Sequence, residues 1–358
     1  MAGRPGPSAG EDVPAACGRA TVPGPGRVAA QQGVYLDPHA GKLRFEEWAP
    51  KWEATLEGYL KPSTRATYAS LQRKHVLPRW GSVPLNRIGH EDVAAWVSEL
   101  SVSGLSPATV RYVHRVLSLQ LALAVKAGRI ASNPAEGVRL PRASRSSEKR
   151  FLSHEEVRAL AEACDDYAGV IYVLAYCGLR WGELAALRVG RVDPLRRRLV
   201  VAESVTEVRG ALVWGSPKSH QQRSVPFPAF VGEHLVAASA GKGTEELVFT
   251  ARRGGVLRNL NFRRDVFDLA AVEAGLAGLT PHELRHTAAS LAVSAGANVK
   301  AVQRMLGHAS AAMTLDVYSG LFDDDLDGVA DRLDSARSVH PLCTGGEVVP
   351  LKQITPGR

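Results

Sequence analysis

The stretch TPHELRHTAAS, residues 280–290, offers two kinds of site. It contains His-Glu-x-x-His, from His282 through Glu283 to His286, the spacing with which two histidines hold zinc while the glutamate acts as a base. It also contains His-x-x-Arg, in which His282 and Arg285 share one side of a helix. The residues around this stretch decide between a metal site and an anion site, and so decide the class of the protein.

The metal interpretation lacks a third ligand. A catalytic zinc site needs three protein ligands and one open position, whereas this motif supplies two. The extended form of the motif would need Gly and His three and six residues after His286, where the chain has Ala289 and Ala292. No Asp or Glu occurs from residue 287 to residue 315. We therefore expect no metal and no cofactor, and keep a zinc metallopeptidase only as the alternative reading of this motif.

The same stretch has the sequence of a helix N-terminus. Thr280 is a natural N-cap, Pro281 fits the first helical position, and Glu283 can reach back to the Thr280 amide in a capping box. His282 then lies in the first turn, where free amides and the helix dipole favour an anion. With Arg285 on the same face, the motif predicts a phosphate site, and His286 is assigned a structural role.

Length and composition favour a nucleic-acid-binding protein of two domains. The 358 residues exceed what one growing core accommodates. The net charge of +8 suggests a polyanionic partner, and the region from residue 43 to 142 holds 14 Lys and Arg against 8 Asp and Glu. No apolar run is long enough to cross a membrane. The four scattered cysteines predict neither disulfides nor a zinc site. We expect a soluble protein of the cytoplasm, associated with the nucleoid.

The predicted fold is mainly α with a small antiparallel β-sheet: a helical domain followed by a mixed α+β domain. The predicted organisation is a disordered N-terminal segment at 1–42, a helical domain at 43–140, a linker at 141–150, a second domain at 151–320 and a C-terminal tail at 321–358. Three strand-like segments predict one sheet around residues 197–227. Helices are expected afterwards at about 261–275, 281–295, 298–306 and 311–319.

Helices of the first domain carry the arginines and lysines that could face phosphates. One helix is predicted to begin at a Ser63 cap, and a longer one at a Ser106 cap with Pro107 in its first turn. The candidates for DNA contact are Arg65, Arg73, Lys74, Arg111 and Arg115.

Two further segments contain residues that suit phosphate chemistry. In YCGLRWGELAAL, residues 176–187, Arg180 lies within an apolar run with Glu183 three positions on. A buried arginine needs a partner, which is either that glutamate or an exchangeable phosphate. In MLGHASAAMTLDVYSG, residues 305–320, His308 precedes Tyr318 by ten residues.

These segments resemble, in order and wording, the four motifs of the tyrosine recombinases, the phage integrase class. CGLRWGEL resembles the first-arginine motif, SPKSHQQRSVPF the hairpin lysine segment, TPHELRHTAAS the His-x-x-Arg motif, and LGHASAAMTLDVY the motif that ends in the nucleophile. The resemblance covers about residues 43–337. It implies that residues 43–140 are a core-type DNA-binding domain and residues 151–320 a catalytic domain.

The resemblance also implies a role for each site residue. Tyr318 would attack a DNA phosphate and leave a 3′-phosphotyrosyl link, which conserves the ester bond without ATP. Arg180 and Arg285 would stabilise the transition state, and Lys218 would protonate the leaving 5′-oxygen. His282 would act as acid and base near Tyr318. His308 would bind the phosphate or orient the tyrosine, and Glu183 would hold the network.

The expected partners are double-stranded DNA at specific attachment-type sites and further copies of the chain as a homotetramer. The resemblance leaves room for accessory DNA-bending or directionality factors. A Xer-like or transposon recombinase is the alternative with the same chemistry, and a non-catalytic DNA-binding relic is the alternative from another class. Residues 1–42 are too short for a whole arm-binding domain, so they would be its remnant. An acidic helix after Tyr318 would pack on a neighbouring protomer or on its own domain.

Overall fold

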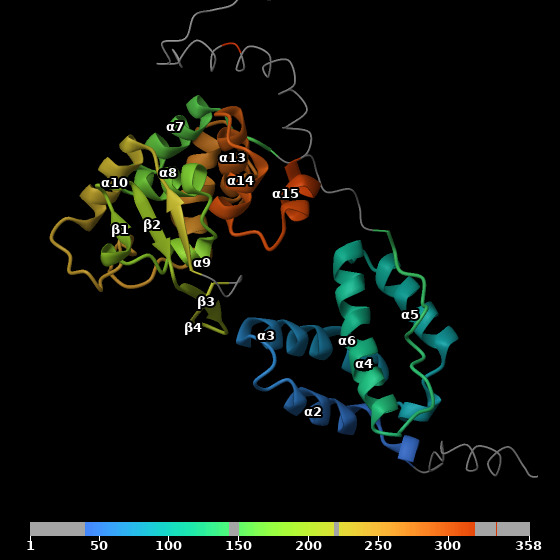
Figure 1. Ribbon diagram of the computed structural model, residues 1–358. Coiled ribbons are helices and arrows are strands. Elements are labelled where there is room, and N and C mark those ends of the chain that lie inside the picture. Colours follow the sequence, from blue (N-terminus) through green and yellow to red (C-terminus); the bar gives the residue numbers. More distant parts are fainter. Residues whose placement is uncertain (1–39, 143–149, 218–221, 319–333, 335–358) are drawn as a thin grey trace, which may run out of the picture. The chain divides into compact units, whose positions relative to one another are not determined.

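A computed structural model describes residues 40–142, 150–217 and 222–318 together with Asp334. The chain divides into two compact units, residues 1–144 and 145–358, each with its own hydrophobic core. The fold class is as predicted: mostly helical, with short antiparallel strands confined, among the described residues, to the second unit (Figure 1).

The first unit consists of helices (Figure 1). They pack around large aromatic side chains. Its helices are α2 (Phe45–Thr55), α3 (Pro62–Leu71), α4 (Leu77–Trp80), α5 (His90–Val102) and α6 (Pro107–Lys126), with a π-helical turn at Gln72–Val76 and 3-10 turns at Ala40–Lys42 and Leu85–Arg87. Trp80 meets Trp96 edge to face, with ring centroids 5.7 Å apart, and Trp52 stacks on Tyr68. These rings join α2, α3, α4 and α5 into one core.

Helix α6 begins as the sequence predicts. The Ser106 hydroxyl accepts a hydrogen bond from the Thr109 amide at 3.2 Å, and Pro107 occupies the first turn. The apolar stripe of α6 is completely buried at Val110, Val113, Leu117, Leu121 and Ala124. The prediction that a helix begins at a Ser63 cap was wrong. Helix α3 already begins at Pro62, with Lys61 at the N-cap, because proline favours the first helical position.

The second unit surrounds the apolar helix α8 (Ala168–Cys177), which packs against α7, α10 and α13. Its other helices are α7 (His154–Ala163), α9 (Trp181–Leu184), α10 (Ala229–Ser239), α11 (Asn259–Phe262), α12 (Asp268–Glu273), α13 (Pro281–Ser294), α14 (Val299–Leu306) and α15 (Ala311–Tyr318). Shorter turns lie at Asp165–Tyr167, Val189–Arg191 and Arg263–Phe267. Because α8 is apolar on nearly every side, it forms the centre of the core.

The strands form two sheets rather than the single sheet predicted. The strands are β1 (Val192–Asp193), β2 (Arg198–Val201), β3 (Ser204–Val208), β4 (Ala211–Gly215) and β5 (Arg223–Pro226). One sheet has the antiparallel order β1-β2-β5, and β3 and β4 form a separate hairpin. Leu199 and Val225, paired across β2 and β5, are buried in the core, whereas Trp214 of the hairpin is 41% exposed. The division into two sheets follows from the different burial of the strands. Strand propensity alone does not reveal this difference in burial.

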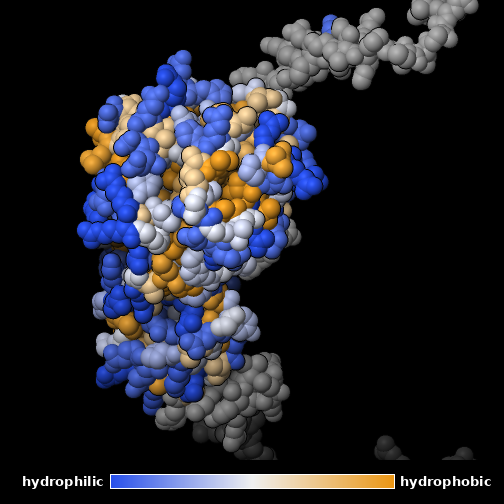
Figure 2. All heavy atoms as spheres, turned by 90° about the vertical axis from the view of Figure 1, so that its left-hand side faces the viewer, coloured by the Kyte–Doolittle hydropathy of each residue, from blue (hydrophilic) through white to orange (hydrophobic). Residues whose placement is uncertain are grey.

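Figure 2 turns the α10 side of the second unit toward the viewer. Hydrophilic side chains cover most of this face, and hydrophobic side chains appear between them. On α10 itself, Phe230 and Val236 are 39% and 52% exposed. In the described part of the chain, no helix is long and apolar enough to span a membrane.

Candidate active site

Arg180 lies in the turn between α8 and α9, where the chain reverses around Gly178. Gly178 ends α8 in the left-handed conformation with φ of 63°, and a Cβ there would lie 2.6 Å from a Leu306 methyl group. The turn is therefore built for glycine on two grounds, backbone conformation and space. Arg180 then forms the N-cap of α9 and donates to Glu183 through its backbone amide and its guanidinium, both at 2.9 Å.

Arg285 is buried and holds the ends of two helices. It comes from the first turns of α13 and is 3% exposed. One of its terminal nitrogens donates to the carbonyl of Gly178, and the other donates to the carbonyl of Leu306 at 2.6 Å. These carbonyls are at the C-terminal ends of α8 and α14, where intrahelical partners run out and the helix dipole is negative. The sequence therefore supplies a buried guanidinium with two polarised acceptors.

Three arginines converge on the C-terminal end of α14. Arg223 donates to the Met305 carbonyl at 3.1 Å, Arg285 to Leu306, and Arg180 to the Gly307 carbonyl at 3.4 Å. The three come from β5, α13 and the α8–α9 turn, which are far apart in sequence. The site thus concentrates positive charge where an anion could be bound.

Arg223 is a site residue that the sequence analysis did not identify. Its guanidinium donates to both carboxylate oxygens of Glu183, at 2.9 and 2.6 Å, and its side chain is only 9% exposed. It lies within the segment SPKSHQQRSVPF, in which the resemblance to the family implies a role for Lys218. The sequence feature that could have indicated Arg223 is its position at the start of a strand. Val225, two residues later on the same face of that strand, is buried.

Glu183 is the negative centre of this cluster. Its side chain is 1% exposed and lies between Arg180 and Arg223. Burial raises the pKa of this carboxyl, but the hydrogen bonds and charges of Arg223 and Arg180 outweigh burial, and the pKa is held below its ordinary value. Glu183 is therefore ionised. The negative charge is what its expected role, to hold the arginines of the site, requires.

Both burial and the neighbouring charges affect the pKa of the Arg285 guanidinium. Burial lowers its pKa to about 9, and the nearby positive charges of Arg180 and Arg223 act in the same direction while Glu183 opposes them. A guanidinium in this setting stays charged at neutral pH. It is also repelled by its arginine neighbours, which favours binding of an added anion.

Tyr318 ends α15 and is buried against α13. Its side chain is 2% exposed, and burial raises its pKa to about 12, with Arg285 opposing the shift. Its hydroxyl lies 2.8 Å from Nδ1 of His286, at hydrogen-bond distance. His286 was assigned a purely structural role from the sequence, yet the fold brings it to the reactive atom of the predicted nucleophile.

His282 lies one turn before His286 on α13 and is exposed. The two rings meet edge to face, with centroids 5.3 Å apart at 80°. The fold therefore orders the three side chains as His282, His286 and Tyr318. The prediction that His282 acts near Tyr318 stays a prediction.

His308 lies beside Tyr318 with its ring nearly parallel to the phenol, at a centroid separation of 6.4 Å and an angle of 6°. Its Nδ1 is 3.0 Å from the Thr314 hydroxyl. Burial, together with the charges of Arg285 and Arg180, lowers the pKa of His308 to about 4. His308 is therefore neutral at neutral pH, and the fold places it beside the tyrosine.

The capping box at the start of α13 is confirmed. The backbone amide and the hydroxyl of Thr280 both donate to Glu283, at 2.7 and 2.9 Å. A carboxylate that accepts these bonds is occupied as a helix cap. Among the described residues, no group of three or more His, Cys, Asp or Glu side chains is arranged to hold a metal ion.

The remaining predicted residues are Lys218 and the candidates for DNA contact in the first unit. Lys218 falls outside the described residues, in the part of the sequence that follows β4 and precedes β5. In the first unit, Arg65 pairs with Glu57 at 2.6 Å, and Arg111 donates to the Pro141 carbonyl at 3.3 Å. Arg73, Lys74 and Arg115 are exposed.

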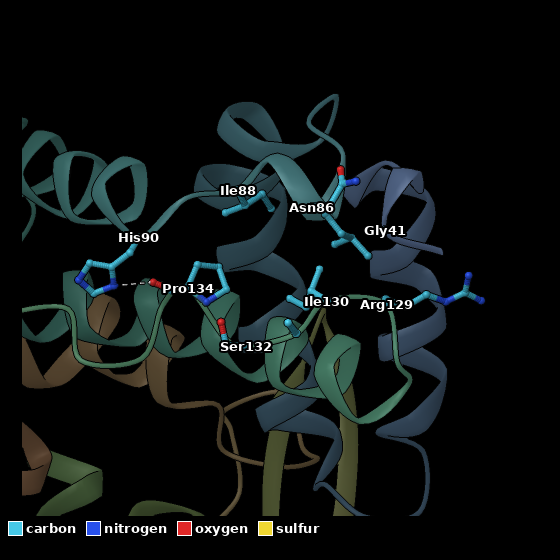
Figure 3. A pocket seen from close by; sticks show the side chains of 10 residues that line it. Gly41, Asn86, Ile88, His90, Arg129, Ile130, Ser132 and Pro134 are labelled. Atoms are coloured by element: carbon cyan, nitrogen blue, oxygen red, sulfur yellow. Dashed lines mark hydrogen bonds between the residues drawn. The ribbon is translucent and has the colours of Figure 1, made fainter. Parts of the chain in front are cut away.

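The first unit has hollows on its surface. One, of about 510 Å³, is lined by α3 and α6 and includes Thr64, Tyr112 and Arg115. Another, of about 480 Å³, is lined by residues such as Asn86, His90 and Arg129 (Figure 3). In that second hollow, Nδ1 of His90 lies 3.0 Å from the Pro134 carbonyl. Of the predicted DNA-contact residues, the first hollow contains Arg115.

Sequence comparisons show the family to which the chain belongs. The sequence model of the phage integrase family matches residues 150–324, and that of the phage integrase N-terminal SAM-like domain matches residues 44–101. The chain belongs to the phage integrase family of tyrosine recombinases, enzymes that break and rejoin DNA strands.

Named relatives are similar in sequence over most of their length. The integrase of Mycobacterium phage D29 is 28% identical over 313 residues, which cover 84% of this chain and 81% of that protein. The tyrosine recombinase XerC of Corynebacterium efficiens is 28% identical, over 70% of this chain and 77% of that protein.

Solved structures show the same fold. The Tn1549 transposon integrase in complex with transposon right end DNA is 21% identical and covers 82% of this chain and all of that one, with a TM-score of 0.68. The lambda integrase tetramer bound to a Holliday junction is 19% identical and covers 81% of this chain and 83% of that one, with a TM-score of 0.62.

Proposed function

We propose that this protein is the integrase of a phage or other mobile element, and that Tyr318 is its nucleophile. The observation that carries this assignment is that the phenol lies against α13, the helix that supplies Arg285, while Arg180, Arg223 and Arg285 meet at the end of α14. A nucleophile and a concentrated positive charge thus belong to one site. Its substrate would be the phosphodiester of double-stranded DNA.

The proposed reaction exchanges one phosphate ester for another. The Tyr318 oxygen attacks phosphorus, the bond to the 5′-oxygen breaks, and a 3′-phosphotyrosyl link remains. Arg180 and Arg285 would stabilise the negative charge that develops on the phosphoryl oxygens, since planar guanidinium groups pair with such oxygens. Lys218 would give the leaving 5′-oxygen its proton. The bond energy is kept in the protein–DNA ester, so a second strand can be joined without ATP.

The other site residues would assist this exchange. Glu183 fixes Arg180 and Arg223, and His308 would donate a hydrogen bond to the phosphate or orient the tyrosine. His282 would exchange protons near Tyr318 during attack and its reversal. Positive side chains of the first unit, namely Arg65, Arg73, Lys74, Arg111 and Arg115, would contact DNA phosphates.

The assembly is proposed by analogy with relatives. Lambda integrase has been solved as a tetramer on a Holliday junction, and a homotetramer that joins two duplexes would suit strand exchange here as well. The tail after Tyr318 that would join protomers lies outside the described residues, apart from Asp334. A transposon or Xer-like role would use the same site on different DNA.

The test is to recover DNA that is covalently attached to the protein. Cells that hold the element and express a tagged chain are lysed in denaturant, and DNA that stays with the protein is sequenced. We expect a defined sequence attached through its 3′ end, with none from Tyr318→Phe. The recovered sequence also separates the roles, because an integrase attaches to an element end and its chromosomal target. Failure of the wild-type chain to retain DNA, or retention by Tyr318→Phe, would refute the proposal.

A further inference from the structure

His286 contacts the reactive atom of Tyr318, and no role in the proposed reaction has yet been given to it. Its Nδ1 is 2.8 Å from the phenolic oxygen, and the two rings lie 5.7 Å apart at 58°. The imidazole is half-buried on α13, next in sequence to Arg285. This contact places a titratable nitrogen where a proton must be lost.

The phenol needs such a group because burial makes its proton hard to remove. Tyr318 is 2% exposed, and burial raises its pKa to about 12. The phenolate is the form that attacks, and a positioned base supplies it during the reaction when the free group is mostly protonated. Bulk water has little access to an oxygen buried in this way.

The neighbouring histidines are placed differently. Nδ1 of His308 lies 3.0 Å from the Thr314 hydroxyl, and the ring is adjacent to the positive charges of Arg285 and Arg180, which disfavour its protonated form. His282 is exposed, and its ring packs edge to face with the ring of His286, with the ring centroids 5.3 Å apart. Of these contacts, the hydrogen bond at 2.8 Å to the phenol is made by His286.

We propose that His286 is a catalytic residue that takes the proton from the Tyr318 hydroxyl during strand cleavage and returns it during rejoining. The proposal rests on the assignment of Tyr318 as the nucleophile. In the resting enzyme the neutral imidazole has no proton on Nδ1 and accepts the hydrogen bond from the phenol. His282, exposed at the outer end, then acts through His286 rather than on the tyrosine itself.

The step balances as follows. The Tyr318 proton moves to Nδ1 of His286 and forms an imidazolium, while the oxygen of Tyr318 bonds to phosphorus. The bond from phosphorus to the 5′-oxygen breaks, and that oxygen receives a proton from Lys218. In the reverse direction the 5′-hydroxyl returns its proton to Lys218 as its oxygen bonds to phosphorus. The bond from phosphorus to the Tyr318 oxygen breaks, and the imidazolium gives its proton to the departing phenolate. No external oxidant, metal or nucleotide enters the balance.

The test uses the full-length protein and a nicked duplex that contains the DNA sequence recovered in the covalent-capture experiment. His286→Asn is the informative variant, because its amide can hydrogen-bond to the phenol but cannot accept a proton. We expect the rate of covalent adduct formation to fall by about 100-fold or more, the range that general acid–base groups supply. His282→Asn is the matched control on the same helix and should have a smaller effect.

A second substrate separates proton removal from protonation of the leaving group. In this duplex the bridging 5′-oxygen is replaced by sulfur, and a thiolate leaves without being protonated. We expect it to restore the rate of Lys218→Ala and to leave His286→Asn slow. Wild-type circular dichroism is required of each variant. Should the Asn variant unfold, His286→Gln carries the same comparison.

Three outcomes would overturn the role of His286. The first is an adduct rate of His286→Asn within about threefold of wild type, well short of the loss expected for a general base. The second is restoration of the His286→Asn rate by the sulfur substrate. The third is a larger loss of rate in His282→Asn than in His286→Asn. An absent adduct with the wild-type chain would instead refute the nucleophile assignment. The two failures are therefore distinguishable.

Discussion

Arg223 on β5 and Glu183 on α9 form a two-pronged ion pair in which each guanidinium terminus meets its own carboxylate oxygen, at 2.9 and 2.6 Å. The same guanidinium donates to the Met305 carbonyl at the end of α14. Arg223 therefore connects the small sheet, the Arg180 turn and the segment that leads to His308. It positions other site residues, and this connection suggests the first prediction.

Arg223→Ala should destabilise the protein by about 3 kcal/mol, because it removes two charged hydrogen bonds from the buried Glu183 carboxylate and leaves only those from Arg180. Denaturant unfolding followed by circular dichroism measures the change. Arg188→Ala is the matched control, since its pair with Glu203 at 3.0 Å is partly exposed and should contribute about 1 kcal/mol or less. Equal losses in the two variants would contradict the assignment of Arg223 to a buried network.

Arg223→Lys should preserve the charge and lose the two-pronged geometry. We expect it to fold and to form the covalent adduct more slowly, by about tenfold, which corresponds to roughly 1.4 kcal/mol in the barrier. The reason is that Glu183 then holds Arg180 less firmly. An adduct rate equal to wild type in the Lys variant would show that the fork is not needed to position Arg180.

Gly178→Ala should disturb the site through both backbone and packing. The new Cβ would lie 2.6 Å from a Leu306 methyl group in a residue with φ of 63°, and overpacking together with left-handed strain costs about 2–4 kcal/mol. Since Gly178 and Leu306 both accept from Arg285, adduct formation should fall as well. Denaturant unfolding and adduct assays measure these effects.

Gly275→Ala is the control for that substitution. Gly275 has φ of 72°, but its added Cβ would meet nothing within 4 Å. It should therefore show the backbone strain alone, about 1–2 kcal/mol, with unchanged adduct formation. A Gly178 variant no worse than the Gly275 variant would contradict the packing argument.

His308 should make stability depend on pH in the acidic range. Its pKa is lowered from 6.5 to about 4 by burial and by Arg285 and Arg180, so between these values the unfolded chain binds a proton that the folded chain does not. This contribution to stability is complete above pH 6.5 and is lost as the pH falls toward 4. Unfolding measured across this range should show a shallower dependence in His308→Asn. An unchanged slope would contradict the shift.

Glu283→Gln should retain adduct formation and lose little stability, because the amide oxygen can still accept the cap bonds from Thr280. Glu283→Ala should cost about 1 kcal/mol in the free energy of unfolding. A chelator should leave adduct formation unchanged in both. Loss of activity in Glu283→Gln or in chelator would favour the zinc interpretation of HELRH.

Local patterns were sufficient where the physical cause is local. The Ser106 cap, the Thr280–Glu283 box and the buried stripe of α6 depend on residues within a few turns of one another. The order of the four motifs was likewise enough to indicate the family. The division of the strands into two sheets was not predicted. Which strands pair depends on which of their faces are buried in the core, and the sequence pattern of a strand does not specify this.

The sequence by itself determined the fold class and the caps at Ser106 and Thr280. It also predicted Arg180, Arg285 and Tyr318 as site residues, since their motifs are continuous stretches of chain. Only the tertiary structure decided that Arg223 completes the site and that His286, rather than His282, meets the phenol. These contacts join residues 40 and 32 positions apart. They depend on how β5, α13 and α15 pack, and long-range packing is a property of the whole core rather than of any one motif.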